Sequence, residues 1–205
     1  MHSDWSSILI RGWLIALAHI KQKEITFEEF VKLDSETDEL LEYIDGMVYY
    51  QASPSIIHQR VSQKLSFELE SHFKYKDCEV FTAPIDILLK NQNIKDTKKV
   101  IPDLVVICDK SGFTENNFTG VPTLIIEILS PSNQSHDLVT KLNLYQKFGV
   151  KEYWIVNPKL NSVHIYTLDE NGMYEETGIF KGKEIAESTI FKGLSVNLEN
   201  IFEQF

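Results

Sequence analysis

The sequence predicts a mixed α/β domain with a central β-sheet flanked by helices, and three observations support this. Helical periodicity covers residues 57–73 and about 136–148. Apolar runs typical of strands lie between and after these helices, for example at 103–108 and 123–129. The chain has 205 residues, 43% hydrophobic and 24% charged, which suits one domain with a sizeable core.

The first half is predicted to hold two helices, a hairpin and a strand. Residues 25–33 (ITFEEFVKL) form a helix in which Thr26 caps the start and Glu29 completes a capping box. Asp45-Gly46 is a strong hairpin signal. Apolar residues recur every four positions in the second helix, at Ile57, Val61, Leu65, Leu69 and Phe73. Residues 79–90 (EVFTAPIDILLK) are expected to be one strand bent at Pro84.

The second half alternates loops, strands and one helix. Residues 90–100 and 114–120 are predicted to be polar loops, followed by strands at 103–108 and 123–129. The helix that ends at Phe148 is stopped by Gly149. Further strands are expected at 152–158 and 162–168, then a hairpin at 170–172 and a terminal helical turn near 198–205.

Cysteine usage and charge limit the classes of protein. Cys78 and Cys108 are far apart and lack metal-ligand spacing, so two unpaired thiols in a reducing cytoplasm are expected. The formal net charge of −10 gives the molecule no general affinity for nucleic acid. Any nucleic-acid contact must therefore be local, weak and sensitive to salt.

The apolar segment 8–20 (ILIRGWLIALAHI) is too short for a membrane span, and Arg11 interrupts it. It also lacks the basic region that precedes the apolar part of a signal peptide. Residues 1–24 are interpreted as an N-terminal helical extension that packs on the domain or contacts a second copy. Residues 25–205 are interpreted as a single domain.

Two carboxylates stand alone among aliphatic residues. Asp103 opens one predicted strand, and Glu127 lies towards the end of the next. Each alone is explained by a hydrogen bond to backbone or by solvent. On neighbouring strands, however, paired carboxylates repel unless a cation lies between them, and Mg²⁺ or Mn²⁺ prefers such oxygen ligands.

The sequence IPD before one strand and a glutamate in the next resembles the PD-(D/E)XK nuclease superfamily. Within it, the chain looks like the Uma-type family of putative restriction endonucleases. The matching segments cover roughly residues 25 to 205 and include LEYIDGMVY, SPSIIHQRVSQKL, IPDLVVI, VPTLIIEILSPS, DLVTKLNLYQKFGVKEYWIVNP and FKGLSVNLENIF.

This resemblance implies a restriction-endonuclease-like core and metal-dependent hydrolysis of DNA phosphodiester bonds. Asp103 and Glu127 would bind Mg²⁺ or Mn²⁺, with the carbonyl of Ile128 as a further ligand. The superfamily places a lysine two residues after the glutamate, but this chain has Leu129 there. The lysine would instead be Lys141, on the following helix.

The residues themselves leave two readings of Lys141. It falls inside an apolar helical stripe formed by Leu138, Leu142, Tyr145 and Phe148. A lysine at such a position either extends outward to solvent or pairs with a buried carboxylate. The family resemblance implies the second. Asp137 lies one turn earlier, where it can pair with Lys141 or favour the helix N-terminus.

Three further residues have both a structural and a functional reading. Glu42 matches a glutamate common in the family, and it either holds a metal-bound water or faces solvent. His58 also matches the family, and it is either a catalytic base or a hydrogen bonder at the start of its helix. Tyr145 either orients Lys141 or packs in the core.

The predicted loop at 90–99 carries Lys95, Lys98 and Lys99, which would bind backbone phosphates beside the acidic site. Its alternative reading is an ordinary solvated loop. A homodimer is expected because cutting both strands of DNA needs two sites. The competing functional hypothesis is a catalytically inactive nuclease-fold module that binds protein or nucleic acid, and an RNA-processing metal enzyme is a third.

Overall fold

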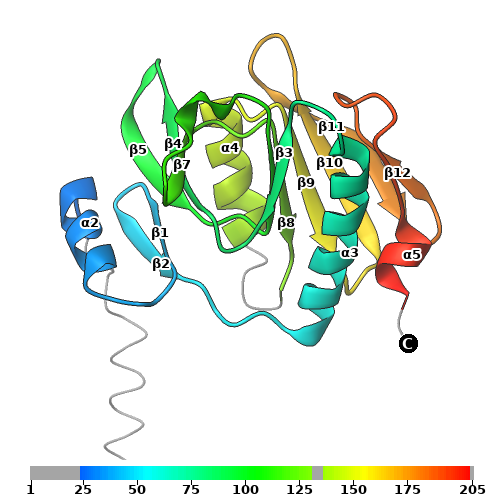
Figure 1. Ribbon diagram of the computed structural model, residues 1–205, viewed down its shortest axis with the longest axis horizontal. Coiled ribbons are helices and arrows are strands. Elements are labelled where there is room, and N and C mark those ends of the chain that lie inside the picture. Colours follow the sequence, from blue (N-terminus) through cyan, green and yellow to red (C-terminus); the bar gives the residue numbers. More distant parts are fainter. Residues whose placement is uncertain (1–23, 131–135, 204–205) are drawn as a thin grey trace, which may run out of the picture.

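The computed structural model describes residues 24–130 and 136–203, which form two large β-sheets with helices packed against them (Figure 1). The six-stranded sheet has the order β11-β10-β9-β8-β6-β3. Strands β8 and β9 are parallel and the other neighbours are antiparallel, so this sheet is mixed, as predicted. Its strands are β3 (Glu79–Thr82), β6 (Leu104–Ile107), β8 (Leu124–Ile128), β9 (Glu152–Asn157), β10 (Ser162–Leu168) and β11 (Tyr174–Lys181).

A five-stranded sheet with the order β2-β1-β5-β4-β7 adjoins it. Its strands are β1 (Leu41–Ile44), β2 (Met47–Tyr50), β4 (Asp86–Asn91), β5 (Ile94–Val100) and β7 (Asn117–Gly120). A small third sheet pairs β12 (Ile185–Glu187) with β13 (Ser195–Asn197).

The helices begin where the sequence predicts them. Helix α2 (Phe27–Ser35) carries the full capping box of Thr26 and Glu29. Helix α3 (Ile56–Phe73) is capped by Ser55, whose hydroxyl accepts from the backbone N–H of His58. The other helical elements are a 3₁₀ turn (Lys110–Gly112), a π-helical turn (His136–Lys141), α4 (Leu142–Phe148) and α5 (Leu198–Phe202).

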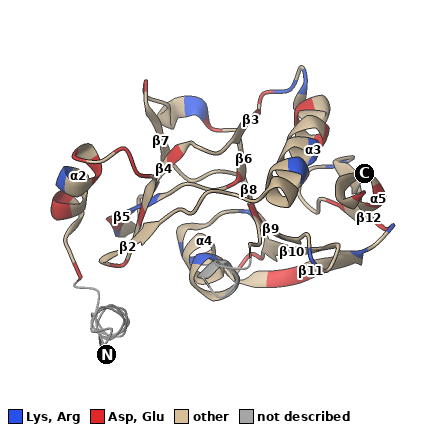
Figure 2. Cartoon of the chain, turned by 90° about the horizontal axis from the view of Figure 1, so that it is seen from below, with Lys and Arg blue, Asp and Glu red and all other residues tan. Residues whose placement is uncertain are grey.

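Helices α3 and α4 lie on opposite faces of the six-stranded sheet (Figures 1 and 2). Side chains alternate along each strand. Ile126 and Trp154 therefore pack with α3, whereas Ile125 and Tyr153 pack with α4 and with the five-stranded sheet. The same alternation assigns Glu127 to the α4 face.

The hairpin at residues 45–46 is confirmed. Asp45 and Gly46 both have positive φ angles, 49° and 84°, as the favoured two-residue hairpin turn requires. This turn sets the register in which Glu42 lies opposite Tyr49.

Four local predictions were wrong. Residues 79–90 form two strands in different sheets rather than one bent strand, and residues 94–100 form β5 rather than a loop. Residues 117–120 form β7, which pairs in parallel with β4. Ile57, placed in the apolar stripe of its helix, is 48% exposed, because the buried stripe of α3 starts at Val61.

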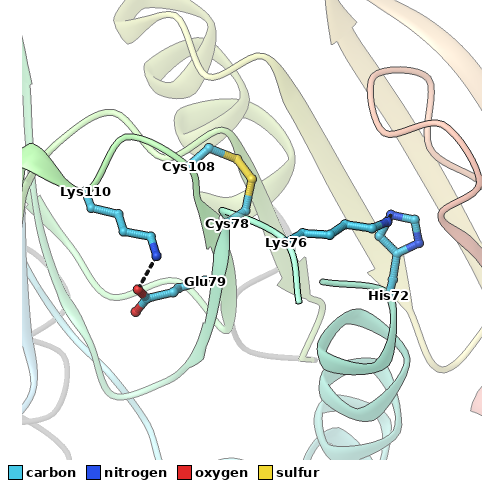
Figure 3. The surroundings of a disulfide bond; sticks show 6 residues. All are labelled: His72, Lys76, Cys78, Glu79, Cys108 and Lys110. Atoms are coloured by element: carbon cyan, nitrogen blue, oxygen red, sulfur yellow. Dashed lines mark hydrogen bonds and ion pairs between the residues drawn. A yellow bond between two sulfur atoms is a disulfide. The ribbon is translucent and has the colours of Figure 1, made fainter. Parts of the chain in front are cut away.

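The prediction of two unpaired thiols was also wrong, because Cys78 and Cys108 form a disulfide (Figure 3). Cys78 precedes β3 and Cys108 follows β6, and the register of these antiparallel strands places the two residues opposite each other. Beside them, Lys110 forms an ion pair with Glu79 at 2.7 Å. Cysteine usage therefore no longer favours a reducing cytoplasm.

Reducing this disulfide is expected to lower the melting temperature. The bond closes a loop with a sequence separation of 30 residues, for which chain entropy gives about 3 to 4 kcal/mol of stabilisation. Thermal melts with and without dithiothreitol test this, with Cys78→Ser as the control that should not respond to the reductant. Identical wild-type melts under both conditions would contradict it.

The N-terminal helical extension, including the apolar segment 8–20, lies outside the described residues. Within residues 24–130 and 136–203, no helix is long and apolar enough to cross a membrane.

Candidate active site

Asp103 and Glu127 come together at one end of strands β6 and β8. These strands are antiparallel, with Leu104 opposite Ile126. Extending this register by one residue sets Asp103 opposite Glu127, and the backbone N–H of Ile128 donates to Asp103 Oδ2 at 2.7 Å. The two carboxylates expected on neighbouring strands are therefore neighbours.

Glu127 is buried, with 3% of its surface exposed, and two side chains from the next helical segment donate to it. Lys141 Nζ lies 2.9 Å from Glu127 Oε1, and the Tyr145 hydroxyl donates to the same oxygen at 2.7 Å. Lys141 is itself only 3% exposed. Of its two readings, pairing with a buried carboxylate is confirmed.

Glu42 is the second carboxylate that contacts Lys141. It comes from β1 in the five-stranded sheet, and its Oε1 lies 3.0 Å from Lys141 Nζ. The same oxygen accepts from the backbone N–H of Ile101 at 2.8 Å. Because Glu42 is 3% exposed, the reading in which it faces solvent was wrong.

Asp103 lies at the rim of this cluster, where its side chain is 19% exposed. Besides the N–H of Ile128, its Oδ2 is 3.1 Å from His58 Nε2, which comes from the first turn of α3. His58 thus bonds at its helix start through its backbone and contacts the site through its ring. Both readings of this histidine are compatible with its position.

The segment before Asp103 is fixed through both polar groups of Ile101. Glu42 accepts from its N–H, and Gln51 Nε2 donates to its carbonyl at 2.7 Å. Ile101 and Pro102 are themselves buried. Because both polar groups of Ile101 are bonded, the backbone that leads into Asp103 has a fixed position.

Lys141 is the last residue of a π-helical turn that leads into α4. Such turns occur often at functional sites because they change which side chains a helix presents. At its other end α4 stops at Gly149, whose φ of 88° makes it a left-handed cap, and Asn91 Nδ2 donates to the Phe148 carbonyl at 2.9 Å. The helix that carries Tyr145 is therefore anchored to β4.

Three carboxylates gather in this cluster. Glu42 and Glu127 both contact the ammonium of Lys141, and Asp103 lies beside His58. Burial, together with the nearby carboxylates Glu127 and Glu42, raises the pKa of Tyr145 well above its ordinary value. Its phenol therefore keeps its proton and donates a hydrogen bond to Glu127.

This donor set fits a hard divalent cation that keeps most of its water. Within the described residues, no group of three or more His, Cys, Asp or Glu is arranged to hold a metal. Mg²⁺, however, commonly uses only one or two protein carboxylates. Asp103 and Glu127 supply two on adjoining strands. The Ile128 carbonyl as a further ligand stays a prediction.

The predicted basic loop has a different structure and different contacts. Lys98 and Lys99 lie in β5, are 3% and 6% exposed, and pair with carboxylates of this chain. Lys98 contacts Asp45 at 2.7 Å, and Lys99 contacts Asp34 at 2.8 Å and Asp86 at 2.9 Å. Lys95 is exposed, and phosphate binding by it stays a prediction.

Over the described elements, Lys and Arg are scattered and do not form a continuous stripe (Figure 2).

The sequence reasoning left the role of Tyr145 open and missed the contact of Glu42 with Lys141. Lys141 and Tyr145 are four residues apart, which places them one turn apart on one helix face. This spacing indicated that both side chains could contact the same group. No comparable signal joins Glu42 to Lys141, because they are far apart in the sequence. The predicted pairing of Asp137 with Lys141 concerns a side chain outside those described.

Comparison with solved structures defines the fold. The chain is similar to a putative nuclease belonging to DUF820 from Anabaena variabilis ATCC 29413, with a TM-score of 0.69 and 22% sequence identity. The similarity covers 87% of this chain and 97% of that one. The two chains therefore share one fold, and the predicted α/β class with a central mixed sheet flanked by helices is confirmed.

Sequence comparison then gives the family. The family model of Uma2, putative restriction endonuclease, matches residues 27–199, so the chain belongs to the Uma2 family. Two uncharacterized relatives come from Synechocystis sp. (strain ATCC 27184 / PCC 6803 / Kazusa). Protein slr1290 is 28% identical over 71% of this chain and 75% of the relative, and protein sll1609 is 26% identical over 66% and 76%.

Proposed function

We propose that this protein is a metal-dependent endonuclease that hydrolyses phosphodiester bonds of DNA. The observation that carries the proposal is the cluster at the ends of β6 and β8, where Asp103 and Glu127 adjoin and Lys141 reaches Glu127 from the following helical segment. Membership of the Uma2 family supports the same reaction class.

In this proposal Asp103 and Glu127 hold Mg²⁺ or Mn²⁺, with the Ile128 carbonyl as a further ligand. When bound, such an ion lowers the pKa of a water molecule and neutralises charge on the phosphate. Lys141 places its amine beside the reacting phosphate, where a positive charge stabilises the pentacovalent transition state. Glu42 fixes the position of that amine from the other side.

His58 is the candidate proton carrier. Its Nε2 is 3.1 Å from Asp103 Oδ2, and its side chain is 13% exposed, so water or substrate can approach the ring. In this proposal the ring is the general base that accepts a proton from the attacking water.

The proposed substrate is bound through few phosphate contacts. Lys98 and Lys99 already pair with carboxylates of this chain, and the formal net charge is −10. We therefore propose that DNA binds weakly and in a salt-sensitive way, with Lys95 taking part. We also propose a homodimer, because cutting both strands needs two sites.

The second candidate is a nuclease-fold module that binds protein or nucleic acid without cutting it. Leu129 stands where the superfamily has its lysine, and the amine of Lys141 is held by two carboxylates, which favours this reading. The two candidates differ in whether a divalent ion is bound and used.

Cleavage assays with metal and matched variants separate them. Purified protein is incubated with plasmid DNA, single-stranded DNA and RNA in Mg²⁺, Mn²⁺ or EDTA. Asp103→Asn and Glu127→Gln are expected to reduce metal-dependent cleavage by about 10²-fold or more. Asp109→Asn is the control, because Asp109 is an exposed acid beyond the opposite end of β6.

Each other outcome has a distinct meaning. Cleavage that survives in both site variants points to a contaminating nuclease. If the wild type neither cuts nor gains thermal stability from either metal, the non-cutting module is favoured. Cleavage of RNA but not DNA would keep the site and replace the substrate.

A further inference from the structure

The hydroxyl of Tyr145 is placed more specifically than core packing requires. The residue is 0% exposed, and its ring packs edge-on against Tyr153 with 5.0 Å between ring centroids. A phenylalanine would fill the same space. Burying a hydroxyl costs free energy unless it finds a partner, and this one donates to Glu127 Oε1 at 2.7 Å.

That hydrogen bond acts on a nearly symmetrical arrangement of charges. Lys141 Nζ is 2.9 Å from Glu127 Oε1 and 3.0 Å from Glu42 Oε1. Distance alone therefore assigns the ammonium to neither carboxylate. Each acid also accepts a second hydrogen bond on the oxygen that contacts the lysine: Glu42 from the backbone N–H of Ile101, and Glu127 from the side chain of Tyr145.

We propose that Tyr145 is a positioning residue that fixes the orientation in which the Glu127 carboxylate binds the metal. The proposal rests on the proposed function, in which Glu127 binds the divalent ion. Two donors on one oxygen prevent the carboxylate from rotating, and such outer hydrogen bonds are typically worth 10- to 100-fold in metal affinity.

Tyr145→Phe tests this because it removes one oxygen atom and keeps the ring. Tyr174→Phe is the matched control: its hydroxyl donates to the Val150 carbonyl at 2.9 Å, away from Glu127. Each variant loses one phenolic hydrogen bond, so their melting temperatures should fall by similar amounts. Only Tyr145→Phe should also change the metal site.

Two measurements distinguish positioning from packing. Calorimetric titration with Mn²⁺ and Mg²⁺ should show about 10- to 100-fold weaker binding for Tyr145→Phe and unchanged binding for Tyr174→Phe. Crystal structures of wild type and Tyr145→Phe without added metal should show the Glu127 carboxylate rotated in the variant.

An unmoved Glu127 carboxylate overturns the proposal, as does wild-type metal affinity in Tyr145→Phe. If the wild type binds neither metal, the proposed function fails, while the crystal structures still decide whether Tyr145 fixes Glu127. The two failures are therefore distinguishable.

Discussion

Replacing Lys141 with methionine is expected to abolish metal-dependent cleavage and to destabilise the fold. Methionine has a similar length but no charge, so Glu42 and Glu127 would face each other without the ammonium that lies 3.0 and 2.9 Å from them. Removing one partner of a buried ion pair costs about 3 to 5 kcal/mol. Loss of one positive charge at the reacting phosphate lowers kcat by about 10²- to 10³-fold.

The double variant Lys141→Met/Glu42→Gln separates these two effects. It removes one negative charge together with the positive one, and the glutamine oxygen can still accept from the N–H of Ile101. Urea unfolding should show that the double variant recovers part of the lost stability, whereas cleavage stays absent.

Lys147→Met is the control on the same helix, because Lys147 is exposed and its removal should change stability by no more than about 0.5 kcal/mol. If Lys141→Met cut DNA at the wild-type rate, the amine would have no part in the chemistry. If it were as stable as Lys147→Met, the buried charges would be compensated elsewhere.

Replacing Glu152 with alanine is expected to cause the largest loss of stability away from the candidate site. Glu152 is 0% exposed and accepts from Trp154 Nε1 at 2.8 Å and from the Ser188 hydroxyl at 2.7 Å. The backbone N–H groups of Thr189 and Ile190 donate to its other oxygen at 2.7 and 3.2 Å. It thereby holds the segment before β13 against β9.

Alanine would leave these four donors, of which Trp154 is fully buried, without their acceptor, which costs about 3 to 5 kcal/mol and lowers the melting temperature by roughly 10 °C. Glu152→Gln keeps the size and one acceptor oxygen, so its loss should be smaller. Glu187→Ala, at an exposed glutamate in β12, is the control for removing an acid. If Glu152→Ala had the same melting temperature as Glu187→Ala, the segment before β13 would not depend on the Glu152 carboxylate.

Local signals in the sequence predicted the elements that short-range chemistry determines. Thr26 and Glu29 form their capping box, and Asp45-Gly46 forms its turn. The strand patterns at 152–157 and 162–168 also correspond to real strands, because each buries a recognisable apolar face. These features depend on residues within a few positions of one another.

Strand β5 could not be read in this way. Its consecutive lysines, Lys98 and Lys99, look like a solvated loop, yet both are buried because Asp45, Asp34 and Asp86 neutralise them. All three carboxylates come from other elements, so the sequence near the lysines gives no sign of them. The disulfide between Cys78 and Cys108 was missed because it depends on the pairing of β3 with β6.

The candidate site divides along the same line. Asp103 and Glu127 were predicted from strand positions. The apolar stripe around Lys141 left two readings open, and the family resemblance favoured the one that the structure confirms, pairing with a buried carboxylate. Metal binding by the two acids stays a prediction. The contact of Glu42 with Lys141 could not be predicted, because it depends on how the two sheets pack together.

The packing of the two sheets also determines when, during folding, Glu42, Glu127 and Lys141 come together. Glu42 belongs to the five-stranded sheet and Glu127 to the six-stranded sheet, and Lys141 contacts both. A chain in which only one sheet has formed cannot bring Glu42 and Glu127 to the same ammonium. Assembly of the two sheets and assembly of this cluster of charged side chains are thus one event. Under the proposed function, a chain that has folded only one of its sheets would lack the complete site.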